Sequence, residues 1–257
     1  MALMTLRYSS PMLACQAEVN VLLPEQQSQF SSTATAAQPY RVLYLLHGLG
    51  DDSCGWLRYT TIDSLVRDTN VAVIMPQVGH SFYTDMARGQ RWFSYIADEL
   101  PEYLHSILPL SSKRRDTYIC GNSMGGYGAM RIALNRPDRF SKAAALSGAL
   151  DIQRFVQSYS LDGFDPRPAF GDRLAISGTE NDLFHLLDKN AAQSDTLPEL
   201  GCICGTEDIL LDESRAFVAH AKSLGIHIYY VECPGQHLWT SWQNMLPQVF
   251  SWLTAEH

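Results

Sequence analysis

The chain alternates between short apolar runs and helix-length amphipathic stretches, and this alternation restricts its fold more than any other feature. The apolar runs have no polar face, which is typical of strands in a parallel sheet covered on both sides. Strands that alternate with helices imply right-handed crossover connections. The sequence therefore predicts an α/β protein with a mostly parallel, doubly wound sheet and helices on both faces.

The individual elements follow from this pattern. Strands are expected at Arg41–Leu46, Val71–Met75, Thr117–Cys120, Ala143–Leu146, Gly201–Cys204 and His227–Val231. The more alternating stretch Ala17–Leu23 predicts an edge strand that feeds a hairpin. Helices are expected at Thr61–Arg67, Glu99–Leu108, Gly125–Asn135, Asp212–Leu224 and Ser241–Leu253, with a further one near Asp182–Lys189. Pro247 leaves the start of the last main helix open.

The length of 257 residues suits a single domain spanning 1–257. Gln26–Gln38, rich in Ser, Thr, Ala and Gln, reads as a loop too short to separate two domains. The segment 151–197 breaks the strand–helix rhythm and contains Gly163, Pro166 and Pro168. We expect it to be an irregular insertion that walls the substrate pocket.

Composition excludes several classes of function. A formal net charge of -8 without a Lys/Arg stripe argues against binding to nucleic acid. No apolar run approaches the roughly 20 residues of a membrane span, and Met1–Val21 has no secretory signal pattern. The six cysteines are scattered as reduced thiols would be, and Cys202 and Cys204 alone do not make a zinc site. We therefore expect a cytoplasmic protein with no metal or cofactor.

The strongest local motif is Gly121-Asn122-Ser123-Met124-Gly125, which follows an expected strand and opens an expected helix. This is the context required of a G-x-S-x-G nucleophile elbow, in which a sharp turn presents the serine hydroxyl near a helix N-terminus. The alternative is a tight strand-to-helix turn that merely contains a serine. Gly126 and Gly128 favour the elbow, because a helix face of small residues can pack closely on the sheet.

A serine hydroxyl needs a base to become a nucleophile, and in this fold the order along the chain is Ser, acid, His. Of eight histidines, only His237 lies on a loop after a late strand. His47 comes too early in the order, and His80 is a weaker candidate for lining the cleft. For the acid, the loop after Gly201–Cys204 offers Glu207 and Asp208, with Asp212 close behind. Asp208 is the prediction, because Glu207 should point away and Asp212 is typical of a helix N-terminus.

Acyl transfer through such a serine requires two N–H donors for the tetrahedral oxyanion. One should be the amide of Met124, directly after the nucleophile. The other is expected in His47-Gly48-Leu49-Gly50, where the flanking glycines let the amide of Leu49 turn toward the site. The alternative for this stretch is an ordinary glycine-rich turn.

Taken together, these motifs resemble the esterase D-like family of α/β-hydrolases and, within it, the bacterial tributyrin-type carboxylesterases. The resemblance rests on Leu45–Gly50, Phe82–Asp85, Glu99–Pro101, Gly121–Ala129, Gly205–Asp208 and Gly235–Trp239, which span nearly the whole chain in family order. It implies the α/β-hydrolase fold, a Ser123–Asp208–His237 triad and an oxyanion hole formed by the Leu49 and Met124 amides.

The resulting prediction is a serine carboxylesterase that hydrolyses short-chain acyl esters of small molecules through an acyl-enzyme. S-formylglutathione hydrolases of this family usually have histidines where this chain has Asn122 and Tyr127, which weakens that alternative. An acetyl or feruloyl carbohydrate esterase is a second alternative. A catalytically silent α/β-hydrolase fold that acts as a binding module is a third. A homo-oligomer is compatible with all of them.

Overall fold

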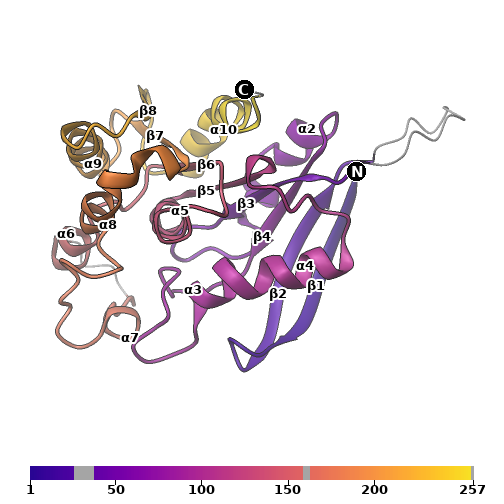
Figure 1. Cartoon of the computed structure of the whole chain (residues 1–257), viewed down its shortest axis with the longest axis horizontal. Helices are drawn as coiled ribbons and strands as arrows, with labels where there is room; N and C mark the ends of the chain where they lie inside the picture. Colours follow the sequence, from indigo (N-terminus) through magenta and orange to yellow (C-terminus); the bar gives the residue numbers. More distant parts are fainter. Residues whose placement is uncertain (26–37, 159–162, 256–257) are drawn as a thin grey trace, which may run out of the picture.

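An eight-stranded sheet with the strand order β1-β2-β4-β3-β5-β6-β7-β8 organises the protein (Figure 1). The computed structural model describes residues 1–25, 38–158 and 163–255. Neighbouring strands from β4 to β8 are all parallel, whereas β1–β2 and β2–β4 are antiparallel. The predicted mostly parallel sheet is therefore confirmed. Of the predicted loop Gln26–Gln38, residues 26–37 lie outside the described residues.

Most strands were predicted to within two residues. The strands of the sheet are β1 (Ala2–Ser10), β2 (Cys15–Leu23), β3 (Arg41–Leu46), β4 (Val71–Pro76), β5 (Thr117–Asn122), β6 (Lys142–Leu146), β7 (Glu199–Gly205) and β8 (Ile228–Cys233). The exception is the sheet edge: the expected edge strand at Ala17–Leu23 is the second strand, because β1 pairs along its whole length with β2. The burial of β1 alternates along the strand, so its pattern is weaker than a continuous apolar run.

Helices cover both faces of the sheet, and each face has its own core. On one face, α1 (Gly55–Tyr59), α2 (Ile62–Val66) and α10 (Trp239–Thr254) pack over Leu43 and Leu45. On the other face, α4 (Leu100–Ile107), α5 (Met124–Asn135), α8 (Leu183–Asn190) and α9 (Leu211–Ser223) pack over Val42 and Tyr44. Figure 1 shows α2 and α10 on the opposite side of the sheet from α4 and α5. Because adjacent side chains of β3 point to opposite faces, one apolar strand supplies both cores.

The remaining elements are short or irregular. A single turn, α3 (Trp92–Ser94), continues through a π-helical turn (Tyr95–Glu99) into α4. The described part of segment 151–197 contains α6 (Ile152–Ser158), α7 (Arg167–Phe170), α8 and a 3₁₀ turn (Ala191–Thr196). A further 3₁₀ turn (Arg114–Asp116) precedes β5.

Helix α10 begins two residues earlier than expected and contains Pro247 in its interior. In the described part of the chain, no helix combines the length and apolarity needed to cross a membrane.

Candidate active site

The loops at the carboxyl ends of four parallel strands converge on Ser123. These loops follow β3, β5, β7 and β8, and they carry respectively Leu49, Ser123, Asp208 and His237. Ligands of open α/β sheets bind at this end of the strands. The sheet topology thus brings together residues that are up to 188 positions apart in sequence, from Leu49 to His237.

Ser123 occupies a strained turn between β5 and α5. Its φ of 52° and ψ of -118° lie in a region that side-chain-bearing residues rarely adopt. The turn is held by its backbone: the Ser123 N–H donates to the Leu146 carbonyl at 3.0 Å, and the Ser123 carbonyl accepts from the amides of Tyr127 and Ala149. This conformation places the serine as the N-cap of α5, with the helix N-terminus beneath it.

The two glycines of the motif are required by close backbone contacts. A Cβ on Gly121 would lie 2.5 Å from the Gly125 carbonyl oxygen, and a Cβ on Gly125 would lie 2.4 Å from the Leu46 carbonyl oxygen. Both distances are below any ordinary contact. The elbow therefore needs glycine at both positions in order to pack against β3.

A continuous hydrogen-bonded chain connects the serine, the histidine and the aspartate. The Nε2 atom of His237 lies 2.9 Å from Ser123 Oγ, although 114 residues separate the two. On the other side of the ring, Nδ1 lies 2.9 Å from Asp208 Oδ1 and 3.1 Å from Oδ2. An ionised carboxylate can only accept, so Nδ1 carries the proton and Nε2 is left to accept the proton of Ser123. The structure thus brings together all three residues predicted from the sequence.

Asp208 is ionised despite its burial. Its side chain has an exposed fraction of 0%. Burial is the largest influence on its pKa and acts to raise it. The hydrogen bond from His237, the electrostatic attraction between the carboxylate and that side chain, and the hydrogen bond from the Leu210 amide outweigh burial and hold the pKa of Asp208 below its ordinary value. A buried negative charge that faces Nδ1 stabilises an imidazolium as it forms.

The competing candidates occupy other positions. Glu207 is exposed and accepts a hydrogen bond from the Gly235 amide at 2.7 Å, which ties the aspartate loop to the histidine loop. Asp212 is exposed in the first turn of α9. His80 is exposed beside the ring of Phe164. His47 is buried and bonds only to backbone groups in the described structure.

The two amides predicted to form the oxyanion hole belong to Leu49 and Met124. Gly48 lies against the serine, because a Cβ at that glycine would be 3.5 Å from Ser123 Cβ. Among the hydrogen bonds of the described residues, neither the Leu49 nor the Met124 N–H donates to a protein acceptor. The Met124 amide belongs to the first turn of α5, where N–H groups have no partner within the helix. In the described part of the chain, both amides are therefore left without protein acceptors, as the donors of an oxyanion hole must be.

Other residues around the site were not identified from the sequence. The Trp242 ring packs perpendicular to His237 with their centroids 5.0 Å apart. Phe82 is fully buried and contacts the rings of Phe155, Phe164 and Phe170 from segment 151–197. These contacts follow from tertiary packing. The only sequence signal for Phe82 was its place in the stretch Phe82–Asp85.

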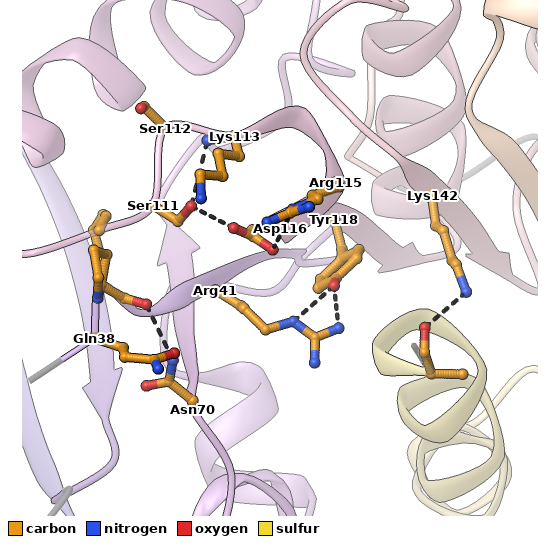
Figure 2. Close-up of a pocket in the computed structure, with 13 residues that line it drawn as sticks. Gln38, Arg41, Asn70, Ser111, Ser112, Lys113, Arg115, Asp116, Tyr118 and Lys142 are labelled. Atoms are coloured by element: carbon orange, nitrogen blue, oxygen red, sulfur yellow. Dashed lines mark hydrogen bonds and ion pairs between the residues drawn. The ribbon is translucent and has the colours of Figure 1, made fainter. Parts of the chain in front are cut away.

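A pocket of about 590 Å³ lies away from Ser123, at the end of the sheet where the parallel strands begin (Figure 2). Arg41 and Lys142, the least exposed basic side chains that line it, are hydrogen-bonded to the protein itself. Arg41 donates to the Tyr118 hydroxyl and the Thr254 carbonyl, and Lys142 donates to the Trp252 carbonyl at 3.0 Å. Both side chains therefore satisfy carbonyls at the C-terminal end of α10. In the part of the chain that the structure describes, no group of three or more His, Cys, Asp or Glu side chains could hold a metal ion.

The chain is similar to known esterases and serine hydrolases. A family model described as "Putative esterase" matches residues 10–253. A protein named acetyl esterase from Caldicellulosiruptor saccharolyticus is 30% identical over 99% of this chain and 98% of its own length.

Two solved structures from Staphylococcus aureus are similar over 99% of both chains at 35% identity. One is the fluorophosphonate-binding serine hydrolase FphF, with a TM-score of 0.92. The other is an S-formylglutathione hydrolase, with a TM-score of 0.88. The predicted α/β-hydrolase fold is thereby confirmed.

Proposed function

The chain belongs to this esterase family, and from that premise we propose that Ser123, His237 and Asp208 are the catalytic triad of an enzyme for short-chain acyl esters. The protein is a serine carboxylesterase. The observation that carries the assignment of the three residues is the unbroken hydrogen-bonded chain from Ser123 Oγ through His237 to Asp208.

In the acylation step, Ser123 Oγ attacks the ester carbonyl carbon while His237 Nε2 takes the hydroxyl proton. The carbonyl π electrons move onto oxygen, and the oxyanion accepts hydrogen bonds from the Leu49 and Met124 amides. The tetrahedral intermediate then collapses and breaks the carbon–oxygen bond to the alcohol. His237 gives its proton to the departing alkoxide, which leaves an acyl-serine and a free alcohol.

Deacylation repeats these events with water as the nucleophile. His237 takes a proton from water as its oxygen attacks the acyl carbon, and the same two amides hold the second oxyanion. Collapse expels Ser123 Oγ, which recovers its proton from His237, and the carboxylic acid is released. Asp208 keeps the ring in one tautomer throughout and stabilises the positive charge in each transition state.

The short-chain preference is supported by an aromatic cluster that reaches the first turn of α5, where the Phe82 ring contacts the Tyr127 ring. Rings of segment 151–197 close over Phe82, with a centroid separation of 5.3 Å between Phe82 and Phe164. We infer that this segment walls the acyl pocket and limits its length. A panel of p-nitrophenyl esters with acyl chains of two to eight carbons tests this inference: kcat/KM should be highest at two to four carbons.

Thioester hydrolysis is the second candidate function. It is favoured by the similarity to the staphylococcal S-formylglutathione hydrolase over the whole chain. It is disfavoured by Asn122 and Tyr127, which stand where histidines are usual in that group. Comparison of kcat/KM for S-formylglutathione, acetylated or feruloylated sugars and short-chain triglycerides separates thioester, carbohydrate ester and simple ester hydrolysis.

The triad itself is tested by Ser123→Ala. We expect this variant to lose p-nitrophenyl acetate turnover and labelling by a fluorophosphonate while its melting temperature stays within a few degrees of the wild type. Ser141→Ala is a matched control, since Ser141 is another buried serine, but it directly precedes β6 and its hydroxyl bonds to the Arg115 and Thr117 carbonyls, away from the triad. A folded Ser123→Ala variant that turns over ester at the wild-type rate refutes the assignment.

We further propose that the enzyme acts in the cytoplasm. All six cysteines are free thiols, which suits a reducing compartment. Cell fractionation with an antibody against the protein tests this. Self-association is a separate proposal, supported by the edge position of β1 and tested by sedimentation velocity.

A further inference from the structure

We propose that Tyr83 is a positioning residue that holds the two halves of the oxyanion hole in register. The two amides belong to separate parts of the fold, since Leu49 follows β3 and Met124 begins α5. A catalytic oxyanion hole requires both donors to point at one position within a fraction of an ångström. Tyr83 contacts both parts. The proposal rests on the assignment of these amides under the proposed function.

One end of Tyr83 binds the loop that carries Leu49. The Tyr83 hydroxyl donates to the His47 carbonyl at 2.8 Å, and the side chain is fully buried. This carbonyl is two residues before Leu49, so its orientation sets the direction of the following backbone. Because His47 and Tyr83 are both buried, water does not reach this carbonyl, and in the described structure the Tyr83 hydroxyl is its hydrogen-bond donor.

The His47 side chain braces the same loop from its other side. Its Nδ1 lies 2.8 Å from the Gly48 carbonyl oxygen, and its Nε2 lies 3.2 Å from the Val78 amide nitrogen. The carbonyl must accept and the amide must donate, so the ring is neutral with its proton on Nδ1. Backbone groups on either side of Gly48 are therefore fixed, one by Tyr83 and one by His47.

The other end of Tyr83 lies against α5. A Cβ on Gly128 would be 2.3 Å from Tyr83 Cδ2, so the ring fills the space that glycine leaves on the helix. Arg131, one turn later, donates from Nη1 to the Tyr83 carbonyl at 3.0 Å. Arg131 is itself fixed by a hydrogen bond from Nε to Asn181 Oδ1. The tyrosine is thus held on the helix that begins with Met124.

The backbone at this position is strained. Phe82 and Tyr83 have φ values of 49° and 53°, in the left-handed region, and both side chains are fully buried. Two consecutive residues of this kind persist only where their surroundings determine the conformation, and such strain is concentrated at functional sites. The strain directs the Phe82 ring toward the rings of segment 151–197 and the Tyr83 ring toward the oxyanion loop.

Tyr83→Phe removes one oxygen and leaves the ring in place. We expect kcat for p-nitrophenyl acetate to fall about tenfold to a hundredfold, because the Leu49 amide is no longer held on the developing oxyanion. KM should change less than threefold, because the Tyr83 hydroxyl binds the His47 carbonyl and not the substrate. The rate of fluorophosphonate labelling should fall with kcat. Tyr44→Phe is the matched control: Tyr44 is also fully buried, and its hydroxyl has no hydrogen-bond partner among the described residues.

Gly128→Ala is an independent second variant, because its methyl group displaces the Tyr83 ring while the hydroxyl remains. This variant should also show a fall in kcat that is larger than any change in KM. A folded Tyr83→Phe enzyme with kcat within twofold of the wild type overturns the proposal, as does an equal loss in Tyr44→Phe. Failure of the underlying function is distinguishable, since in that case Ser123→Ala itself would remain active.

Discussion

His237 Nδ1 and Asp208 Oδ1 are 2.9 Å apart, and the aspartate has no exposed side-chain surface. The carboxylate also accepts the Leu210 amide at 2.8 Å, so it is held from the start of α9 as well as by the ring. The histidine faces a fixed acceptor on one side and the Ser123 hydroxyl on the other. Its tautomer is therefore dictated by the fold.

Asp208→Asn tests this relationship. An asparagine fits the same space but can present an N–H to Nδ1, which forces the histidine proton onto Nε2 and removes the base. We expect kcat for p-nitrophenyl acetate to fall by about 10⁴-fold, the size of loss seen when the triad tautomer is wrong. KM should be little changed.

Glu207→Gln is the control for this substitution, because glutamine retains an acceptor for the Gly235 amide. It should keep kcat within about threefold of the wild type. If Glu207→Gln lost activity and Asp208→Asn retained it, the acid of the triad would have to be reassigned to Glu207.

The parallel part of the sheet was predictable because each strand is apolar on both faces. Arg41–Leu46 was predicted to the residue, since a run buried in two cores carries a strong signal. Ala2–Ser10 was not identified, because half of its side chains face solvent and only its pairing with β2 makes it a strand.

The triad candidates were predictable for a related reason. Chain order and the placement of loops after strands are fixed by the topology, so Ser123, Asp208 and His237 could be chosen by position. Tyr83 could not be chosen in this way. Its contacts with the His47 carbonyl and with Gly128 depend on how a loop folds back between two elements. The spacing of residues along the sequence does not predict how this loop folds back.

Gly125→Ala should destabilise the fold more than an alanine at an uncrowded glycine. Its Cβ would lie 2.4 Å from the Leu46 carbonyl oxygen, so β3 and α5 must separate. We expect the free energy of unfolding in urea to fall by about 3 kcal/mol. Gly225→Ala is the comparison, because Gly225 has a φ of +76° but nothing within 4 Å, so only the backbone penalty of about 1–2 kcal/mol applies. Equal losses in the two variants would contradict the close contact at the elbow.

Arg131→Lys should be destabilising although it keeps the charge. The guanidinium donates from two different nitrogens, to Asn181 and to the Tyr83 carbonyl, and stacks 4.4 Å from the centre of the Phe93 ring. An ammonium group cannot reproduce this planar geometry. We expect a loss of about 2 kcal/mol in urea unfolding.

Arg136→Lys, at the C-terminal end of the same helix, is the control for Arg131→Lys. Arg136 is about one-third exposed and pairs with Asp98, so its replacement should cost less than about 1 kcal/mol. A larger loss at position 136 than at position 131 would count against a bracing role for Arg131.

Glu213→Gln should stabilise the protein, and the gain should depend on pH. Glu213 is 1% exposed, and burial raises its pKa to about 8. From the ordinary value of 4.5 up to about 8, the unfolded chain releases this proton while the folded protein retains it. Stability of the wild type therefore falls with rising pH by up to about 1.4 kcal/mol per pH unit from this group.

Glutamine does not titrate and can still accept the Asp151 amide. Urea unfolding at pH 5 and pH 7.5 should show a larger gain at the higher pH, whereas Asp212→Asn, which changes the exposed neighbouring acid, should show none. A difference between Glu213→Gln and the wild type that is the same at both pH values would mean that Glu213 is already ionised in the folded protein.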